Sequence, residues 1–406
     1  MPFFKGKKSV FLKAAALSTA LLLYCTALFS CAPKPSDSLD EQPSPSLSTS
    51  PIILANASSS PSLSAKSAVL IDADSGAVLF EKNADERLSM ASTTKIMTAL
   101  VAIESCDITK EVSIPREAVG VEGSSIYLYE GEKLTLQDLL YAMLLESAND
   151  AATAIAIEVG GSVENFAEMM NKKASSLGLE NTHFENPHGL DGESHYTTAR
   201  ELGKIASCAM GNETFCQIVS TYKKTIPLNG TEGVRLLINH NKLLKNYDGA
   251  MGIKTGYTKK SGRCLVSCAE RDGLRLIGVT LSAPDDWRDH KALLDYGFSL
   301  YESRLLYKKG EFKHILPMIG GEGEYVTLSN REDIRITLPK SQTEIKYTVE
   351  AKQFEYAPIS ENTVMGTLYC SSDGVRVAEV PLYADYSVEK IKEKTIWEML
   401  ISLFKK

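Results

Sequence analysis

A serine and a lysine stand three residues apart at the head of an apolar, helix-forming run, Met90–Leu100. One helical turn would place the hydroxyl of Ser92 beside the amine of Lys95. A serine becomes a strong nucleophile when a neighbouring base takes its proton, and an amine can do so when burial or a second cation lowers its pKa. The pair therefore predicts nucleophilic chemistry, although Ser-x-x-Lys alone is common on helix surfaces.

Two further motifs add the residue types that such chemistry needs. Ser147 and Asn149 lie at an expected break between two helices, and Lys254-Thr255-Gly256 lies just ahead of an expected strand. Two lysines that converge on one pocket repel each other, so the more buried lysine can be neutral while the other stays cationic. That arrangement would provide one general base and one receptor for an anion. Ser147 and Asn149 could instead simply cap the following helix.

In this order, the three motifs resemble the triple signature of the penicillin-recognising serine enzymes. With Asp191 and the stretch 248–257, they are most similar to the low-molecular-mass penicillin-binding proteins that are serine-type D-Ala-D-Ala carboxypeptidases. The resemblance covers residues 66–300 well and the rest more loosely. It implies an α+β fold: a penicillin-recognising serine transpeptidase/β-lactamase-like domain, with helices on an antiparallel sheet, and a small β-rich C-terminal domain.

The resemblance also assigns the first four site residues. Ser92 would be the acylated nucleophile and Lys95 its general base. Ser147 would relay a proton to the leaving amine, and Asn149 would hydrogen-bond the substrate backbone. The substrate would be a peptidoglycan stem peptide ending in D-Ala-D-Ala, with β-lactam antibiotics as inhibitors, and no cofactor is implied.

The second half of the site would bind the substrate's terminal carboxylate and the reacting carbonyl. Lys254 and Thr255 would grip the carboxylate, next to Gly256. The backbone N–H of Tyr257, with that of Ser92, would form the oxyanion hole. Arg288 is the candidate for an arginine that helps to bind carboxylate in the family. His188 and Asp191 are expected to stabilise their loop.

Two rival functions remain. A β-lactamase on the same fold would deacylate quickly through a glutamate-positioned water, for which Glu180 and Glu185 are the nearby candidates. A non-catalytic envelope-binding lipoprotein would keep only the fold. The β-rich tail argues against the first rival, and the complete set of chemical groups argues against the second.

The overall composition limits the classes of partner. The 406 residues carry a net charge of −7 with no long basic run in the body of the chain, so nucleic acid is not an expected partner. The eight cysteines show no CxxC spacing, and we predict no metal site. Cys264 and Cys268 lie in an apolar strand-like run and are expected to be buried thiols.

The N-terminus predicts export to the cell envelope. Several lysines precede an apolar stretch over residues 14–30, the order of an export signal. Leu28-Phe29-Ser30-Cys31 resembles the bacterial lipobox, in which the cysteine is lipidated, although Phe29 is unusual for that motif. Lipidation of Cys31 and an uncleaved anchor both stay open, and either places the protein at the outer face of the cytoplasmic membrane.

We divide the chain into an export signal (1–31), a Ser- and Pro-rich tether (32–64), a catalytic domain (65–304), a β-rich domain (305–387) and a terminal amphipathic helix (388–406). In the catalytic domain we expect strands at 67–72, 77–81, 264–269 and 274–281. We also expect a helix at Ser92, a helix at 136–145, a second helix that follows the break at 146–150 and runs through 157, and helices at 162–177, 198–210 and 293–300.

The terminal helix is predicted to lie on the membrane surface. An apolar stripe recurs at helical spacing, and lysines flank it at both ends, as in an interfacial anchor that meets anionic headgroups. The alternative is a helix docked on the β-rich domain. The stripe consists of Ile396, Trp397, Leu400, Leu403 and Phe404.

Overall fold

The computed structural model describes residues 60–228 and 233–392. The predicted export signal and Cys31 therefore lie outside the described residues. The predicted tether reaches too far, because Leu63 is buried in the domain core. Ser64 is also bound, since its backbone N–H and its hydroxyl both donate to the carboxylate of Asp289, at 3.0 and 2.7 Å.

The catalytic domain is built on a five-stranded antiparallel sheet with the order β2-β1-β9-β8-β7. The first and the last described strands of the domain thus come together in one sheet. The predicted strands at 67–72 and 77–81 are confirmed and pair as a hairpin, and the strand at 274–281 is confirmed as well. The strands of the sheet are β1 (Ser67–Asp72), β2 (Val78–Lys82), β7 (Ala250–Thr258), β8 (Gly262–Arg271) and β9 (Leu274–Leu281).

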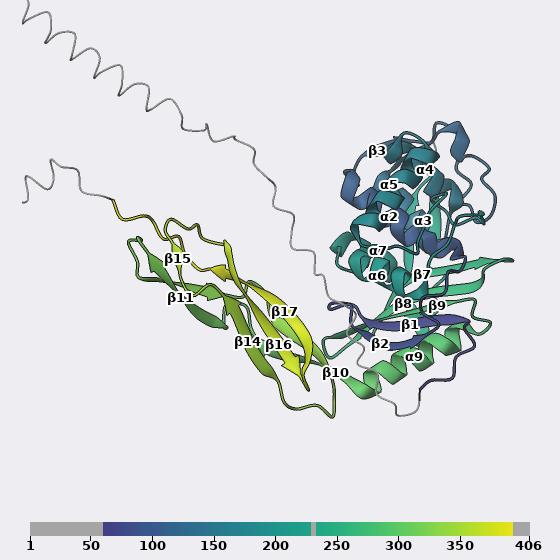
Figure 1. Ribbon diagram of the computed structural model, residues 1–406. Helices are drawn as coiled ribbons and strands as arrows, with labels where there is room; N and C mark the ends of the chain where they lie inside the picture. The colour runs from purple at the N-terminus through teal and green to yellow at the C-terminus, as the bar shows by residue number, and fades with distance from the viewer. Residues whose placement is uncertain (1–59, 229–232, 393–406) are drawn as a thin grey trace, which may run out of the picture. The chain divides into compact units, whose positions relative to one another are not determined.

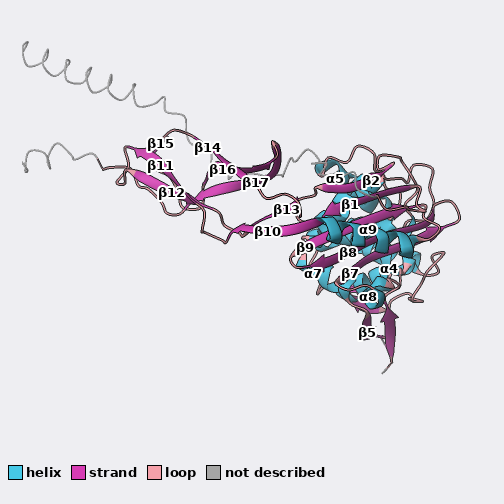
Figure 2. Cartoon of the chain, turned by 90° about the horizontal axis from the view of Figure 1, so that it is seen from below, coloured by secondary structure: helices cyan, strands magenta, loops and turns pink. Residues whose placement is uncertain are grey.

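Helices cover both faces of this sheet. Figure 1 shows α9 below the sheet and the other large helices above it, and the view from below in Figure 2 has α9 in front of the strands. The helices are α2 (Lys95–Ser105), α3 (Leu136–Leu145), α4 (Asn149–Gly160), α5 (Val163–Ser176), α6 (Ala199–Met210), α7 (Glu213–Ser220), α8 (Leu243–Asn246) and α9 (Asp286–Leu300), with 3-10 turns η1 (Ala91–Thr94) and η2 (Arg116–Ala118). The expected helix at 293–300 is only the second half of α9.

Local sequence signals fix several helix ends. Thr135 accepts a hydrogen bond from the backbone of Asp138, whose carboxylate accepts one from the backbone of Thr135. This reciprocal capping box satisfies two amides that a helix start leaves without partners. Ser162 and Thr198 cap α5 and α6 with one hydrogen bond each, in which the side chain accepts from a backbone N–H three residues later. Two short hairpins, β3 (Glu111–Ser113) with β4 (Lys133–Thr135) and β5 (Lys223–Pro227) with β6 (Val234–Ile238), complete the domain.

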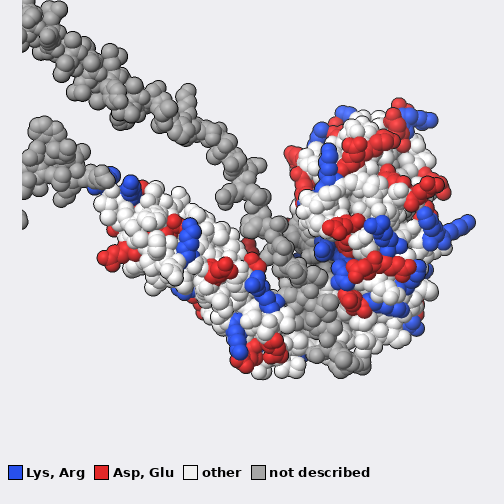
Figure 3. Space-filling view, viewed as in Figure 1, with Lys and Arg blue, Asp and Glu red and all other residues white. Residues whose placement is uncertain are grey.

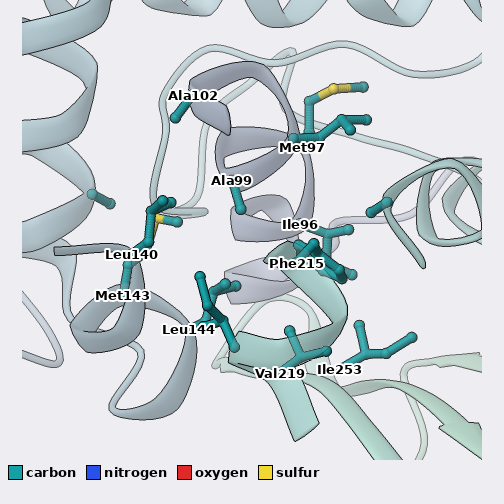
Figure 4. Close-up of a cluster of buried hydrophobic side chains, with 14 of the residues drawn as sticks. Ile96, Met97, Ala99, Ala102, Leu140, Met143, Leu144, Phe215, Val219 and Ile253 are labelled. Atoms are coloured by element: carbon teal, nitrogen blue, oxygen red, sulfur yellow. The ribbon is translucent and has the colours of Figure 1, made fainter. Parts of the chain in front are cut away.

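Helix α2 runs through the centre of the largest apolar core. Ile96, Met97 and Leu100 on this helix are almost completely buried. Figure 4 shows α2 surrounded by side chains of α3, α7 and β7. Because packed cores deform little, the residue at the start of α2 is held in a fixed position. The side chains labelled on these neighbouring elements are Leu140, Met143, Leu144, Phe215, Val219 and Ile253.

The C-terminal domain is entirely β within the described residues. Its six-stranded sheet has the order β14-β16-β17-β12-β11-β15, and β10 pairs with β13. Alternate residues of the strands form a separate apolar core around Leu316, Leu328, Leu368 and Leu382. The strands are β10 (Tyr301–Tyr307), β11 (Lys313–Ile319), β12 (Tyr325–Ser329), β13 (Ile334–Pro339), β14 (Lys346–Ala351), β15 (Glu355–Tyr356), β16 (Val364–Ser372) and β17 (Val375–Ala384).

The predicted terminal helix does not begin at Val388. Val388 forms a β-bridge with Ile359, and Lys390 forms one with Gly321. Backbone pairing with the β-rich domain has thus replaced the first turn of the expected helix, and its apolar stripe at 396–404 lies outside the described residues. Across residues 60–228 and 233–392, the structure contains no helix with the length and apolarity needed to cross a membrane.

On the face shown in Figure 3, acidic and basic side chains are interspersed.

Candidate active site

Ser92 lies in the tight turn that leads into α2. It belongs to the 3-10 turn η1, and the α-helix itself begins at Lys95. Ala91 has a φ of 48°, a left-handed conformation that non-glycine residues seldom adopt. Such strained residues cluster at functional sites. The turn brings Ser92 Oγ to 3.1 Å from Lys95 Nζ, so the predicted pairing of the two side chains is observed.

The amine of Lys95 is enclosed on all sides. Its residue is fully buried, and Nζ donates to Asn149 Oδ1 at 2.7 Å and to the backbone carbonyl of His188 at 2.6 Å. A neutral amine has two hydrogens and one lone pair. In this neutral form, the two carbonyl oxygens would take both hydrogens, and the lone pair would face the hydroxyl of Ser92.

Burial lowers the pKa of Lys95 well below its ordinary value of 10.5, and the nearby charge of Lys254 lowers it further, while Asp150 acts in the opposite direction. An ammonium removed from water loses its hydration, so the neutral form is favoured. This is the state that a general base requires. The geometry and the electrostatics of Lys95 therefore agree.

The break between α3 and α4 supplies the second group of predicted residues. Ser147 is buried and has a φ of 61°, which turns the chain sharply between the two helices. Asn149 opens α4. Besides accepting from Lys95, it donates from Nδ2 to the carbonyl of Glu122 at 2.5 Å. Its amide is therefore fixed in orientation. The alternative that Ser147 and Asn149 simply cap α4 does not hold, because the N-cap residue is Ala148 and no side chain caps the helix.

Lys254, Thr255 and Gly256 lie inside strand β7, which the sequence analysis did not predict. The expected strand that they precede is β8. Glycines and polar residues weaken the strand pattern here, but the backbone pairs regularly with β8. Lys254 is buried, and its Nζ donates to the carbonyl of Thr255 at 2.8 Å. Burial lowers the pKa of Lys254 to about 7.

Two glycines let neighbouring segments press against the nucleophile turn. A Cβ atom added at Gly256 would lie 3.1 Å from the backbone nitrogen of Ser92, so β7 runs directly beside that N–H. A Cβ at Gly189, which has a φ of 87°, would lie 2.0 Å from the carbonyl oxygen of Ala91. Tyr257 follows on β7 and is 66% exposed. The turn is thus held between the loop at 189 and β7.

The structure does not bring Arg288 into this cluster. Arg288 lies on α9, where its guanidinium pairs with Asp285 at 3.4 Å and with Asp289 at 3.8 Å. Its side chain is largely exposed. A second basic residue, Arg263, stands opposite Tyr257 in the register of β7 and β8. Its guanidinium pairs with Asp286 at 3.5 Å.

Two supporting roles escaped the sequence analysis. The carbonyl of His188, rather than its ring, contacts Lys95, and no pattern of side chains can reveal a backbone acceptor. Asp150 is fully buried and binds the loop before the site, through the Ser125 hydroxyl at 2.6 Å and the backbone N–H of Leu128 at 3.1 Å. Asp191 joins its loop to the end of β7, since it accepts from Thr258 Oγ1 at 2.9 Å.

The comparison with known protein families supplies the identity. Residues 54–285 match the family model of D-alanyl-D-alanine carboxypeptidases, peptidase family S11. Residues 301–390 match the C-terminal domain of penicillin-binding protein 5. The chain belongs to the D-alanyl-D-alanine carboxypeptidase family. It is therefore a serine-type peptidase, and the predicted fold, with its β-rich C-terminal domain, is confirmed.

Individual relatives agree with this assignment. D-alanyl-D-alanine carboxypeptidase DacF of Bacillus subtilis (strain 168) is 36% identical over 326 residues, which cover 78% of this chain and 83% of the relative. The crystal structure of penicillin-binding protein 5 from Haemophilus influenzae has a TM-score of 0.69 at 30% identity and covers 82% of this chain and 99% of its own. A mutant of the Streptomyces K15 DD-transpeptidase has a TM-score of 0.56 at 36% identity, covering 59% of this chain and all of its own.

We predict that Gly189→Ala slows acylation of the carboxypeptidase by at least tenfold, because the new methyl group would displace the Ala91 carbonyl and with it Ser92. Gly178→Ala is the matched control. Gly178 has a similar φ of 68° but has nothing within 4 Å of an added Cβ, so both variants carry the same backbone cost of roughly 1–2 kcal/mol.

The measurement is the rate of labelling by a fluorescent penicillin, alongside thermal unfolding. Equal acylation rates in the two variants would show that contact between Gly189 and the nucleophile turn does not matter.

Proposed function

We propose that the enzyme removes the terminal D-alanine from peptidoglycan stem peptides through an acyl-enzyme on Ser92, and that penicillins acylate the same hydroxyl. The observation that carries this proposal is the enclosed amine of Lys95, 3.1 Å from Ser92 Oγ and held by two carbonyl acceptors. It supplies what a serine peptidase without a histidine base needs, a neutral amine aimed at the nucleophile.

In the acylation step, Ser92 Oγ attacks the carbonyl carbon of the penultimate D-alanine while its proton passes to Lys95 Nζ. The negative charge that develops on the substrate oxygen is stabilised by the backbone N–H groups of Ser92 and Tyr257. The closeness of β7 to the Ser92 nitrogen supports this pairing. Such donors contribute most when they are fixed before the reaction starts.

The tetrahedral intermediate then collapses. The C–N bond to the terminal D-alanine breaks, and its amine takes a proton that Ser147 relays from Lys95. Water next attacks the ester of Ser92 with Lys95 as base, and the shortened peptide leaves. In a β-lactam the amine stays tethered to the acyl group, which keeps the site blocked. Asn149 would hydrogen-bond the peptide backbone during both steps.

Recognition of the terminal carboxylate falls to Lys254 and Thr255 on β7. The arriving carboxylate would raise the pKa of Lys254 and hold it in the cationic form. Arg288 stays outside this assignment because of its ion pairs with Asp285 and Asp289. The division of labour between two buried lysines follows from their surroundings, since only Lys95 has a carbonyl cage beside the serine.

We predict that the wild-type protein forms one penicilloyl adduct and releases D-alanine from a D-Ala-D-Ala peptide, and that Ser92→Ala does neither. Intact-mass spectrometry and a D-alanine assay measure the two outcomes. Fast turnover of penicillin without release of D-alanine would instead identify a β-lactamase. An adduct that persists in Ser92→Ala would contradict the choice of nucleophile.

The two lysines should limit activity at opposite ends of the pH range. Lys95 must be neutral and Lys254 cationic, so kcat/KM for a substrate with a free carboxylate should fall as pH rises through about 7, where free Lys254 loses its proton. Arginine keeps its proton throughout this range. We therefore predict that Lys254→Arg moves the alkaline limb to higher pH, whereas Lys95→Arg abolishes acylation at every pH.

Steady-state profiles from pH 5 to 10 test this assignment, with exposed Lys204→Arg as the control that should leave the profile unchanged. An alkaline limb that stays in place in Lys254→Arg would show that another group titrates there.

We also propose that the enzyme is held at the membrane surface from both ends, through lipidated Cys31 and through an apolar stripe within residues 393–406. The support comes from the sequence alone: the lipobox-like run ending at Cys31 and the spacing of Ile396, Trp397, Leu400, Leu403 and Phe404 between lysines. One acyl chain anchors a protein only marginally, so a second contact would be needed for stable attachment.

Vesicle flotation with anionic lipids tests the two anchors. The full chain purified from membranes should float, and loss of 393–406 or Cys31→Ser should each reduce the floating fraction. If neither change affects it, the attachment is not made by these segments.

A further inference from the structure

His195 lies buried behind the nucleophile turn, and the proposed mechanism does not use it. It is 3% exposed, and its ring packs edge-on against Phe184 at 5.9 Å. The backbone N–H of Glu185 donates to its Nδ1 at 3.1 Å. Its Nε2 lies 2.7 Å from the hydroxyl oxygen of Thr94, two residues beyond Ser92. Both ring nitrogens are therefore engaged.

The chemistry of these groups fixes the direction of the hydrogen bonds. A backbone N–H can only donate, so Nδ1 of His195 is an acceptor and the ring proton is on Nε2. That proton goes to Thr94 Oγ1. The single hydroxyl hydrogen of Thr94 is then free to donate to the carbonyl of Ala91, at 2.8 Å. The result is a one-way chain from Glu185 through His195 and Thr94 to Ala91.

The end of this chain is the peptide unit that precedes the nucleophile. The carbonyl of Ala91 and the N–H of Ser92 belong to the same amide, so a hydrogen bond accepted by the oxygen makes the N–H a stronger donor. The same bond helps to hold Ala91 at its φ of 48°. With the carbonyl fixed, the direction of the Ser92 N–H is fixed as well.

We infer that His195 is a positioning residue that acts through Thr94 to orient and strengthen the Ser92 N–H as an oxyanion donor. The inference rests on the proposed acylation of Ser92. Burial lowers the pKa of His195 to about 4, so the ring stays neutral and the direction of the chain is constant across the working range of the enzyme. A second proton on the ring would remove the acceptor that Glu185 requires.

The test compares His195→Phe, Thr94→Val and the double variant with the conservative Thr94→Ser, which keeps the hydroxyl. His183→Phe is the matched control, because His183 lies on the same loop and its Nδ1 contacts the carbonyl of Ser194 instead of the nucleophile turn. Stopped-flow acylation by a chromogenic cephalosporin separates the first-order acylation rate from the affinity of the preceding complex.

Removing an oxyanion donor entirely costs about 10²–10³-fold in rate, so weakening it through His195→Phe or Thr94→Val should slow acylation by about ten- to fiftyfold with little change in affinity. Because both residues act through one chain, the double variant should be no slower than the worse single variant. Thr94→Ser should restore most of the rate, and His183→Phe should match the wild type.

Infrared spectroscopy gives a readout that a merely structural role would not move. With a ¹³C-labelled penicillin, the ester carbonyl of the acyl-enzyme should absorb at higher frequency in the slow variants, because weaker hydrogen bonds polarise it less. If His195→Phe fails to fold, the comparison of Thr94→Val with Thr94→Ser tests the inference on its own.

Wild-type rates in both Thr94→Val and His195→Phe, additive losses in the double variant, or an unchanged carbonyl frequency would overturn the inference. Failure of the wild type to form an adduct at Ser92 would instead overturn the proposed function.

Discussion

The enclosure of one lysine amine is the constraint on which the rest of the site depends. Lys95 Nζ has a serine hydroxyl on one side and two carbonyl oxygens on the others, and each of these groups comes from a different segment. The helix α2 brings the lysine, α4 brings Asn149, and the loop at 188 brings a backbone carbonyl. The apolar core around α2 fixes their relative positions, since a packed interior resists small displacements.

This arrangement has a cost in stability. Burial lowers the pKa of Lys254 from 10.5 to about 7, which corresponds to a loss of about 5 kcal/mol of folding stability at low pH. The loss is complete below pH 7, where both the folded and the unfolded chain hold the proton, and it disappears as pH rises towards 10.5. The burial of Lys95 adds to this cost in the same direction. The left-handed backbone conformations of Ala91 and Ser147 also lower folding stability. Active sites often retain such destabilising features.

The features predicted well from the sequence are those that depend on local chemistry. The helices expected at 136–145, 162–177 and 198–210 and the strands at 67–72 and 77–81 depend on residues close together in the chain, and the structure shows local caps at Thr135, Ser162 and Thr198. The pairing of Ser92 with Lys95 likewise needs only one helical turn. The motif resemblance then supplied the order of distant parts.

The features that were missed depend on tertiary contacts. Strand β7 carries glycines and polar residues because it runs against the Ser92 turn, and this gives a weak strand pattern around Lys254. The contact between Lys95 and the backbone carbonyl of His188 cannot be predicted from side-chain patterns. The bridges of Val388 to Ile359 and of Lys390 to Gly321 took the place of the first turn of the expected helix, because backbone partners distant in the sequence lie beside it, and local periodicity does not register such partners.

The most direct test of the central claim is the protonation state of the Lys95 amine itself. NMR of protein labelled with ¹³C and ¹⁵N in lysine reports the charge of each side chain, and Lys95→Arg and Lys254→Arg assign the two shifted signals. The account predicts that Lys95 is neutral at pH 7 and that Lys254 titrates near 7. A Lys95 signal that remains cationic up to about pH 10, the ordinary range for lysine, would contradict it.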